Sequence, residues 1–363
     1  MPSNGILVND VFGSYRVLHQ IGEGGMGEVY LAEHKHIDRK AAIKVLRPEF
    51  SANADLVNRF FAEARSANLI KHQGIVEIYD CSVLPNGCAY IVMEYLEGQS
   101  LGAALERVGH IDEIATMVDL SWQIATTLQA AHDKNIIHRD LKPDNIFLTF
   151  VPHLGPGPVI KVLDFGIAKL LHSTVKHTRT GSLLGTPLYM SPEQARGLTS
   201  VDHRSDIYSL GCIMFEMNTG RTPFVRDGMG DLIIAHASEI PPPASKIQPK
   251  IPPEIDQLIT GMLAKRPEHR PRSMQKVAEV LHMFLVTKGG MAATVNAGPG
   301  MDDGPTSQFH RPLTSFELSP ASPPASPAAL SPRPVVPTAI LPPSEAEPRQ
   351  VASIVQTPMM AEN

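Results

Sequence analysis

The stretch IIHRDLKPDNIFL, residues 136–148, decides how the rest of this chain is interpreted. Two carboxylates, two cations and an amide lie between Arg139 and Asn145, and apolar residues flank them on both sides. A fully exposed loop would not be expected to have apolar residues on both sides, and a fully buried strand would not be expected to contain so many charged residues. The pattern therefore predicts two short β-like segments that hold a polar loop at the edge of a core, where proteins often place their chemistry.

The composition excludes several classes of protein. The chain has 363 residues, 43% of them hydrophobic, which is enough for two packed lobes and a tail. A formal net charge of −5 gives no support for binding to nucleic acid or to a membrane surface. The three cysteines, Cys81, Cys88 and Cys212, have no CxxC spacing, and no HExxH motif occurs, so neither a disulfide framework nor a metal cage is expected. We expect all three cysteines to be small buried residues.

Targeting signals are not visible in the sequence. The first ten residues, MPSNGILVND, lack a basic start followed by an apolar run. No uninterrupted apolar stretch approaches the ~20 residues that a membrane-spanning helix needs. We therefore expect no membrane span and a cytoplasmic location.

The texture of the chain predicts four zones. After a short extension (residues 1–10), residues 11–97 alternate in the manner of β-strands, with one helical stretch inside. Residues 98–286 are mainly helical, including a long amphipathic helix and an apolar central helix that ends at Gly220. Residues 287–363 are rich in Pro, Ser and Ala, so we expect a disordered segment with polyproline character.

A glycine-rich motif lies between the first two predicted strands. GEGGMGEV places Gly22, Gly24 and Gly27 where backbone amides could approach phosphates without side-chain collision. Alone this motif is weak, because tight turns often match it. Since a strand follows rather than a helix, a β-hairpin over a nucleotide fits better than a dinucleotide fold. The next strand carries Lys44, and a helix carries Glu63, which are either a phosphate-binding cation with its partner or ordinary surface residues.

Four polar residues between positions 140 and 164 carry the strongest chemical signal. Asp140 can accept or orient a hydroxyl proton, and Lys142 can neutralise a transferring phosphoryl group. Asn145 and Asp164 offer oxygen ligands for a hard metal ion. An ordinary charged loop or a simple turn could account for any one of these residues. Neither accounts for all four residues at these positions.

These strings, in this order, resemble the eukaryotic-like (Hanks-type) Ser/Thr protein kinases, and most of all their bacterial branch. The resemblance runs from Tyr15 to Leu285. It implies an α+β, two-lobed protein-kinase fold, in which a small antiparallel β-sheet lobe with one helix precedes a larger, mainly helical lobe. It also implies ATP and Mg²⁺ as cofactors and proteins as substrates.

The resemblance implies a role for each matching residue. Lys44 would bind the α- and β-phosphates and pair with Glu63, Asp140 would face the substrate hydroxyl, and Lys142 would contact the γ-phosphoryl group. Asn145 and Asp164 would hold Mg²⁺. The residues that would surround ATP are Ile21, Gly22, Glu23, Gly24, Gly25, Met26, Gly27, Val29, Ala42, Lys44, the gatekeeper Met93, Glu94, Leu96 and Phe147.

Further residues would shape the activation segment and support the loop. Ser191-Pro192-Glu193 stands where many relatives have Ala-Pro-Glu, and Glu193 would pair with Arg270. Asp206 would bind the catalytic loop's backbone, although it could also be an ordinary helix N-cap. Arg139 would need an anion, which a phosphate on the activation segment could supply. The remaining residues implied here are Phe165, Gly166, Thr186 and the autophosphorylation sites Thr178 and Thr180.

Two other functions remain open from the sequence. A catalytically silent scaffold would commonly lack Lys44, Glu63, Asp140, Asn145 or Asp164, all of which are present. A metabolite or lipid kinase is disfavoured by Lys142, Thr186 and the Ser191–Glu193 segment. The tail is either a solvated spacer or a docking segment with Ser-Pro sites, for which we expect a soluble partner. A transient kinase-domain dimer is also open.

Overall fold

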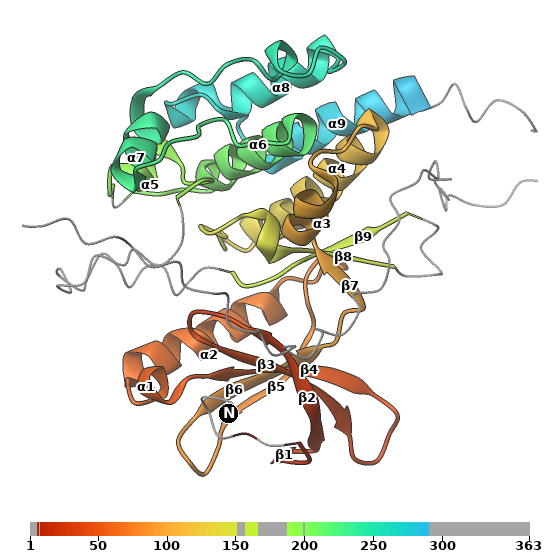
Figure 1. Ribbon diagram of the computed structural model, residues 1–363, viewed down its shortest axis with the longest axis vertical. Coiled ribbons are helices and arrows are strands. Elements are labelled where there is room, and N and C mark those ends of the chain that lie inside the picture. The colour runs from red at the N-terminus through yellow and green to blue at the C-terminus, as the bar shows by residue number, and fades with distance from the viewer. Residues whose placement is uncertain (1–5, 7, 151–156, 166–186, 199, 290–363) are drawn as a thin grey trace, which may run out of the picture. The chain divides into compact units, whose positions relative to one another are not determined.

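A six-stranded antiparallel sheet makes up most of the first lobe (Figure 1). The structure is a computed structural model that describes residues 6, 8–150, 157–165, 187–198 and 200–289, all within one unit, Met1–Ala321. The strand order is β1-β2-β3-β4-β6-β5. The strands are β1 Val11–Phe12, β2 Tyr15–Glu23, β3 Gly27–His34, β4 Lys40–Leu46, β5 Ile78–Val83 and β6 Ala89–Glu94.

Two helices connect β4 to β5. The short helix α1 (Pro48–Ser51) precedes α2 (Ala54–Leu69), which begins at an Asn53 cap whose side chain accepts hydrogen bonds from two backbone amides. Phe60 and Ala64 on α2 pack with Leu46, Ala89 and Ile91 of the sheet. This apolar contact sets the position of Glu63, which lies on the same helix.

The second lobe is built around helix α6 (Arg204–Thr219), which is buried along nearly its whole length. Gly220 ends this helix with φ +73°, as its predicted cap requires. Figure 1 shows α6 beside α4, which packs in turn against α9. The other helices are α3 Leu101–Val108, α4 Ile114–His132, α5 Pro192–Ala195, α7 Met229–Ser238, α8 Pro253–Met262 and α9 Met274–Gly289. None of the helices in the described ranges is long and apolar enough to cross a membrane.

A three-stranded sheet, β7-β8-β9, connects the helical part to the first lobe. Its strands are β7 Gly98–Ser100, β8 Ile146–Thr149 and β9 Val159–Val162. In this sheet, β8 follows the polar loop directly, and β9 ends two residues before Asp164. Residues 151–156, between β8 and β9, lie outside the described ranges.

The linker from α2 to β5 is attached to the second lobe. The amide of Val162 donates a hydrogen bond to the Gly74 carbonyl at 2.7 Å, and Ile75 forms a parallel bridge with Val162. A Cβ on Gly74 would lie 2.1 Å from the Thr127 hydroxyl of α4, so only glycine fits here. The linker is therefore fixed to the helical part at several points.

The predicted two-lobed fold is confirmed, with two local corrections. Ile136 and Ile137 form no strand, because the hydrogen-bonded apolar segment beside the polar loop is β8, after it. Cys81 is exposed and not buried, since it lies on the edge strand β5, whereas Cys88 and Cys212 are buried as expected. The predicted domain limits at residues 10, 97 and 286, and the disorder of the tail, stay predictions.

Candidate active site

A buried carboxylate holds the polar loop in place. Asp206 accepts hydrogen bonds from the backbone amides of His138 and Arg139, each at 2.9 Å, and from the His132 ring at 2.8 Å. Burial alone would raise the pKa of Asp206, but the His132 hydrogen bond and charge outweigh it, so the pKa is lowered. Asp206 is not the helix N-cap, a position occupied by His203, so the N-cap alternative is wrong.

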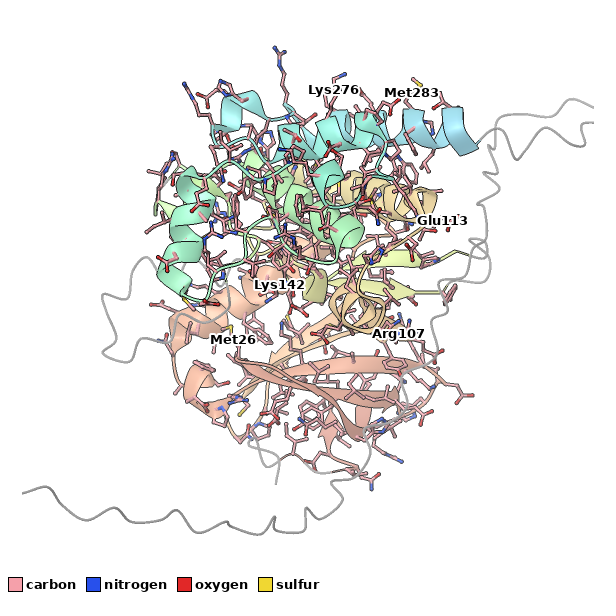
Figure 2. The ribbon with its side chains drawn as sticks, turned by 45° about the horizontal axis from the view of Figure 1, so that its top comes forward. Met26, Arg107, Glu113, Lys142, Lys276 and Met283 are labelled. Atoms are coloured by element: carbon pink, nitrogen blue, oxygen red, sulfur yellow. The ribbon has the colours of Figure 1, made fainter. Side chains whose placement is uncertain are left out.

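Asp140 lies at the centre of this loop. The Asn145 side-chain amide donates to the Asp140 carbonyl at 2.8 Å, and the Lys142 ammonium is 3.7 Å from the Asp140 carboxylate. Lys142 is labelled in Figure 2 at the side of the helical lobe that is nearer to the sheet. The loop therefore closes on itself, with a carboxylate and an ammonium that remain partly accessible, at 22% and 33% exposure.

Lys44 and Asp164 join the two lobes across 120 residues of sequence. The Lys44 ammonium donates to the Asp164 carboxylate at 2.7 Å. Burial would lower the pKa of Lys44, but the charges of Asp164 and Glu63 outweigh it and raise the pKa. Burial would likewise raise the pKa of Asp164, yet the Lys44 ammonium lowers it. Both groups are therefore charged at neutral pH.

Glu63 is close to this pair and shares a side-chain hydrogen bond with Asp164, but it forms no ion pair with Lys44. Among the described residues, the ion pair of Lys44 is with Asp164, and the expected Lys44–Glu63 ion pair is not formed in this conformation. Burial raises the pKa of Glu63 to about 8, with the Asp164 charge adding to it and the Lys44 charge opposing it. The charge of Asp140 also raises this pKa, so all four groups share one electrostatic environment.

The protonated state of Glu63 has a measurable consequence for stability. Its folded pKa of about 8 lies above the ordinary value of 4.5, so between these pH values the folded chain holds a proton that the unfolded chain has lost. Stability then falls as pH rises through this window. Glu63→Gln cannot ionise, so its stability relative to the parent should rise by roughly 3–4 kcal/mol between pH 5 and pH 8, because each pKa unit corresponds to about 1.4 kcal/mol.

Urea unfolding of both proteins at pH 5, 6.5 and 8 measures this difference. Glu106→Gln, which makes the same substitution on the exposed face of α3, is the matched control. A Glu63→Gln difference that stays constant from pH 5 to pH 8 would show that Glu63 is ionised in the folded chain.

The residues around Asp164 are locked by an aromatic contact. The buried His138 ring lies 4.9 Å from the Phe165 ring, and its Nε2 is 3.0 Å from the Leu163 carbonyl. Asp164 itself has φ +45° and Arg139 has φ +64°, a left-handed backbone that non-glycine residues adopt rarely. Such conformations persist where surrounding contacts enforce them, and they gather at functional sites.

Asn145 and Asp164 are suitable ligands for Mg²⁺. The amide nitrogen of Asn145 is used by the Asp140 carbonyl, which leaves the side-chain oxygen of this amide for a cation. Asp164 adds an ionised carboxylate. Oxygen atoms of one amide and one carboxylate fit Mg²⁺, which keeps several waters and uses few protein ligands.

The glycine-rich loop is held by contacts from the end of β4. The Arg47 guanidinium donates to the Glu23 carboxylate at 2.7 Å and to the Gly24 carbonyl at 3.3 Å, and its backbone amide donates to Met26 at 3.0 Å. A Cβ on Gly27 would lie 2.2 Å from the Val45 carbonyl, so the loop needs glycine there to cross β4 closely. Arg47 belongs to none of the sequence motifs, so its contacts with the glycine-rich loop could be recognised only in the structure.

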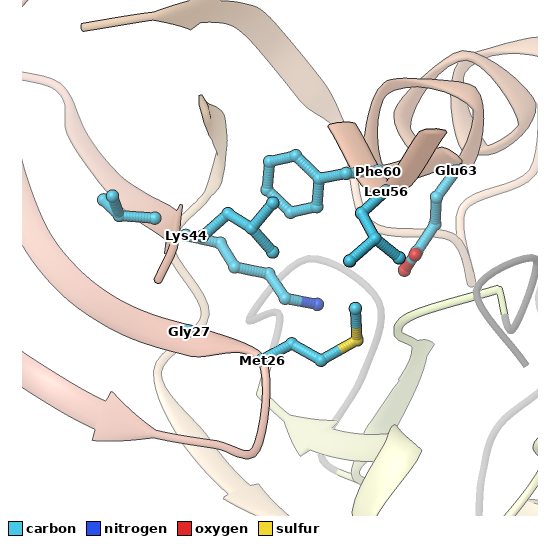
Figure 3. A pocket seen from close by; sticks show the side chains of 8 residues that line it. Met26, Gly27, Lys44, Leu56, Phe60 and Glu63 are labelled. Carbon is cyan, nitrogen blue, oxygen red and sulfur yellow. The ribbon is translucent and has the colours of Figure 1, made fainter. Parts of the chain in front are cut away.

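Met26 at the tip of this loop points into a cavity of about 20 Å³, shared with Lys44 and Glu63 (Figure 3). This space holds about one water molecule. Leu56 and Phe60 of α2 form its apolar side. The loop tip, the lysine and the helix glutamate predicted for the ATP phosphates therefore meet in one place.

The residues predicted around adenine lie on adjacent strands. Ala42 is paired with Met93 across β4 and β6, and Val29 with Lys44 across β3 and β4. Glu94, next to Met93, forms a 2.7 Å ion pair with Lys161 of β9, which the sequence did not indicate. Ile21 is exposed, whereas Val29, Leu96 and Phe147 are partly buried.

Glu193 and Arg270 form the expected ion pair. Two parallel hydrogen bonds of 2.7 and 2.8 Å join them, and their side chains are 5% and 0% exposed. Burial would raise the pKa of Glu193, but the Arg270 and Ser205 hydrogen bonds lower it. The remaining Arg270 donors reach backbone carbonyls of Ala264, Arg204 and Lys265.

Some predicted residues lie outside the described ranges, and others were missed. Gly166, Thr178, Thr180 and Thr186 belong to the undescribed segment 166–186. His132, Lys161 and Arg47 were not singled out, because their partners are distant in sequence. Gln194, which donates to the Arg139 carbonyl at 2.8 Å, could have been noticed from the capping-box spacing Ser191-x-x-Gln194.

With this geometry established, comparison with known proteins gives the family. Residues 15–283 match the protein kinase domain family. The chain belongs to the protein kinase family. The kinase domain thus accounts for nearly all of the described residues, and the resemblance to bacterial Hanks-type Ser/Thr kinases is confirmed. ATP and Mg²⁺ are the cofactors of this family.

Several relatives are bacterial Ser/Thr kinases. The chain is 39% identical to serine/threonine-protein kinase Pkn1 of Myxococcus xanthus, over 96% of this chain and 49% of that protein. It is 38% identical to PknA of Mycobacterium tuberculosis, over 72% of this chain and 59% of the relative. The kinase chain spans about half the length of the curated relatives it matches. The crystal structure of the Mycobacterium tuberculosis PknI kinase domain matches with a TM-score of 0.60 at 26% identity, covering 77% of this chain and 99% of that one.

Proposed function

We propose that this chain is an ATP- and Mg²⁺-dependent protein kinase that transfers the γ-phosphate of ATP to Ser or Thr hydroxyls of proteins in bacterial signalling. The observation that carries this proposal is the 2.7 Å pair between Lys44 of the sheet lobe and Asp164 of the helical lobe, beside Glu63. Phosphoryl transfer needs placement and neutralised charge more than covalent help, and these groups supply both.

The polar loop would act on the substrate. Asp140, held from behind by Asn145 and through its neighbours by Asp206, would orient the hydroxyl and accept its proton. Lys142 would neutralise charge on the transferring group, and Lys44 would bind the α- and β-phosphates. Asn145 and Asp164 would hold Mg²⁺, which supplies positive charge to the phosphate oxygens.

A transfer assay tests the proposal directly. The purified chain, incubated with radiolabelled ATP, Mg²⁺ and a generic basic protein, should label itself and that protein on Ser and Thr, as phosphosite mapping will show. Nucleotide binding without any transfer would favour the scaffold alternative. Labelling of a metabolite with no labelled protein would favour the small-molecule kinase.

We further propose that autophosphorylation of Thr178 or Thr180 activates the kinase. The support is the Arg139 guanidinium, whose buried Nε has no hydrogen-bond partner within the described part of the chain. A buried cationic donor of this kind is satisfied well by a phosphate, which can order the segment that carries it.

Replacing both Thr178 and Thr180 with Ala should lower the initial rate of peptide phosphorylation about tenfold, because a charge-assisted contact to Arg139 is lost. Thr260→Ala, on α8, is a control that should keep the parent rate. A double variant as active as the parent, after prior incubation of both with ATP, would remove the autophosphorylation proposal.

The remaining expectations are proposals about location and partners. We propose a cytoplasmic location, protein substrates, a transient kinase-domain dimer and docking of a partner on the Pro-rich residues 287–363. Polyproline segments of this composition fit aromatic grooves on partner domains.

A further inference from the structure

Arg139, the residue before Asp140, has a backbone conformation that needs support. Its φ of +64° lies in the left-handed region, which L-residues other than glycine, Asn and Asp rarely adopt. This conformation sets the direction of the peptide that joins Arg139 to Asp140. Whatever holds the Arg139 backbone therefore also sets the position of Asp140.

Both backbone polar groups of Arg139 are held by side chains from elsewhere. Its amide donates to Asp206 at 2.9 Å, and its carbonyl accepts a hydrogen bond from the side-chain amide of Gln194 at 2.8 Å. The carbonyl belongs to the peptide unit that joins Arg139 to Asp140. Gln194 thus acts on the peptide next to the candidate catalytic carboxylate, from a distance of 55 residues in sequence.

The orientation of the Gln194 side chain is fixed at its other end. Its Oε1 accepts hydrogen bonds from the backbone amide of Ser191 at 3.1 Å and from the Ser191 hydroxyl at 3.0 Å. The bond from the Ser191 amide is one half of the capping box of the short helix α5, and the Gln194 backbone amide completes it by donating to the Ser191 hydroxyl at 3.4 Å. Because Oε1 is used in this way, Nε2 is the end of the side chain that reaches the loop. The adjacent Glu193 is fixed to Arg270, so the helix is a firm base for this contact.

We propose that Gln194 is a positioning residue for Asp140, which couples the Ser191–Gln194 segment to the catalytic loop. The proposal deepens the proposed kinase function and rests on it. Helix α5 would then have a second role besides anchoring the end of the activation segment. The helix must be formed for the Gln194 side chain to hold the peptide between Arg139 and Asp140.

Gln194→Glu separates this task from helix capping. A glutamate fits the same capping box, since its carboxylate also accepts from Ser191, but it has no proton to donate to the Arg139 carbonyl at pH 8. We expect kcat to fall about tenfold while KM for ATP changes less than twofold, because the ATP-binding residues are not touched. Ser191→Ala is the matched control: it weakens the cap, keeps the Gln194–Arg139 contact, and introduces the Ala found in many relatives.

Hydrogen exchange of the backbone amides gives a readout that does not depend on activity. In Gln194→Glu, the amides of Arg139 and Asp140 should exchange at least fivefold faster than in the parent and in Ser191→Ala. Equal exchange and equal kcat in Gln194→Glu and the parent would overturn the inference, as would equal defects in Gln194→Glu and Ser191→Ala. If the parent transfers no phosphate, the proposed function fails, and the exchange rates alone decide whether Gln194 positions the loop.

Discussion

Asp140→Asn is expected to lower kcat for phosphate transfer about 10³-fold. A positioned general base contributes roughly 10²–10⁴-fold to a rate, and an amide cannot accept the substrate proton. The main contacts of this loop use backbone atoms, such as the Asp140 carbonyl that binds Asn145 and the amides that bind Asp206. The asparagine variant should therefore fold normally and still bind nucleotide.

Steady-state kinetics with a generic peptide, together with ATP binding by calorimetry, measures this effect. Asp144→Asn is the matched control, because Asp144 is an exposed carboxylate of the same loop, and its kcat should change less than about threefold. A variant Asp140→Asn that retains a tenth or more of the parental kcat would show that placement and charge, and not this carboxylate, supply most of the catalysis.

Arg270→Met is expected to lower the free energy of unfolding by about 3–5 kcal/mol, because it leaves the buried Glu193 carboxylate without its partner. The Arg270 side chain is fully buried and its bonds to Glu193 and to three backbone carbonyls would all be lost. Buried ion pairs differ in this respect from exposed ones, whose loss costs about 0–1 kcal/mol.

Arg266→Met provides the comparison within the same segment. Arg266 pairs with Glu268, but the two side chains are 69% and 50% exposed, so this variant should lose less than about 1 kcal/mol. Because the folded pKa of Glu193 is lowered, the stability it contributes is present above its ordinary pKa of 4.5 and is lost as pH falls below it. The difference in unfolding free energy between the parent and Arg270→Met, measured with urea, should therefore become smaller in acid. A difference below about 1 kcal/mol at pH 7 would contradict a stabilising role for the Glu193–Arg270 pair.

The sequence was sufficient to predict the two-lobed fold, and its motifs selected polar residues that the structure brings close together. Lys44, Asp140, Asn145 and Asp164 stand in ordered motifs, and the period of the apolar residues located the strands and helices that carry them. Motifs of this kind are readable because each requires particular residue types at fixed spacing. The predicted pairs Glu193–Arg270 and Asp206–loop were also found.

The partners of the remaining residues could not be predicted, because they depend on packing between distant segments. Lys44 was expected to pair with Glu63, but its ion pair is with Asp164, a choice that depends on the position of α2 relative to β4. Three other contacts, Arg47–Glu23, Lys161–Glu94 and Gln194–Arg139, join residues that are distant in sequence. No sequence motif contains both residues of any of these pairs. Cys81 was placed in the core because the edge position of β5 is not visible in its sequence.

The attachment of the Gly74–Ile75 linker to α4 and β9 determines how α2 can rotate. Because α2 is attached at its C-terminal end, any rotation of this helix would pivot near Ile70. At 1.5 Å per residue, Glu63 is roughly 10 Å from this pivot and Asp55 is roughly 22 Å from it. A rotation of about 10° would therefore move Glu63 by about 2 Å and Asp55 by about 4 Å. A spectroscopic label near Asp55 would therefore report any such rotation of α2 with about twice the amplitude seen at Glu63.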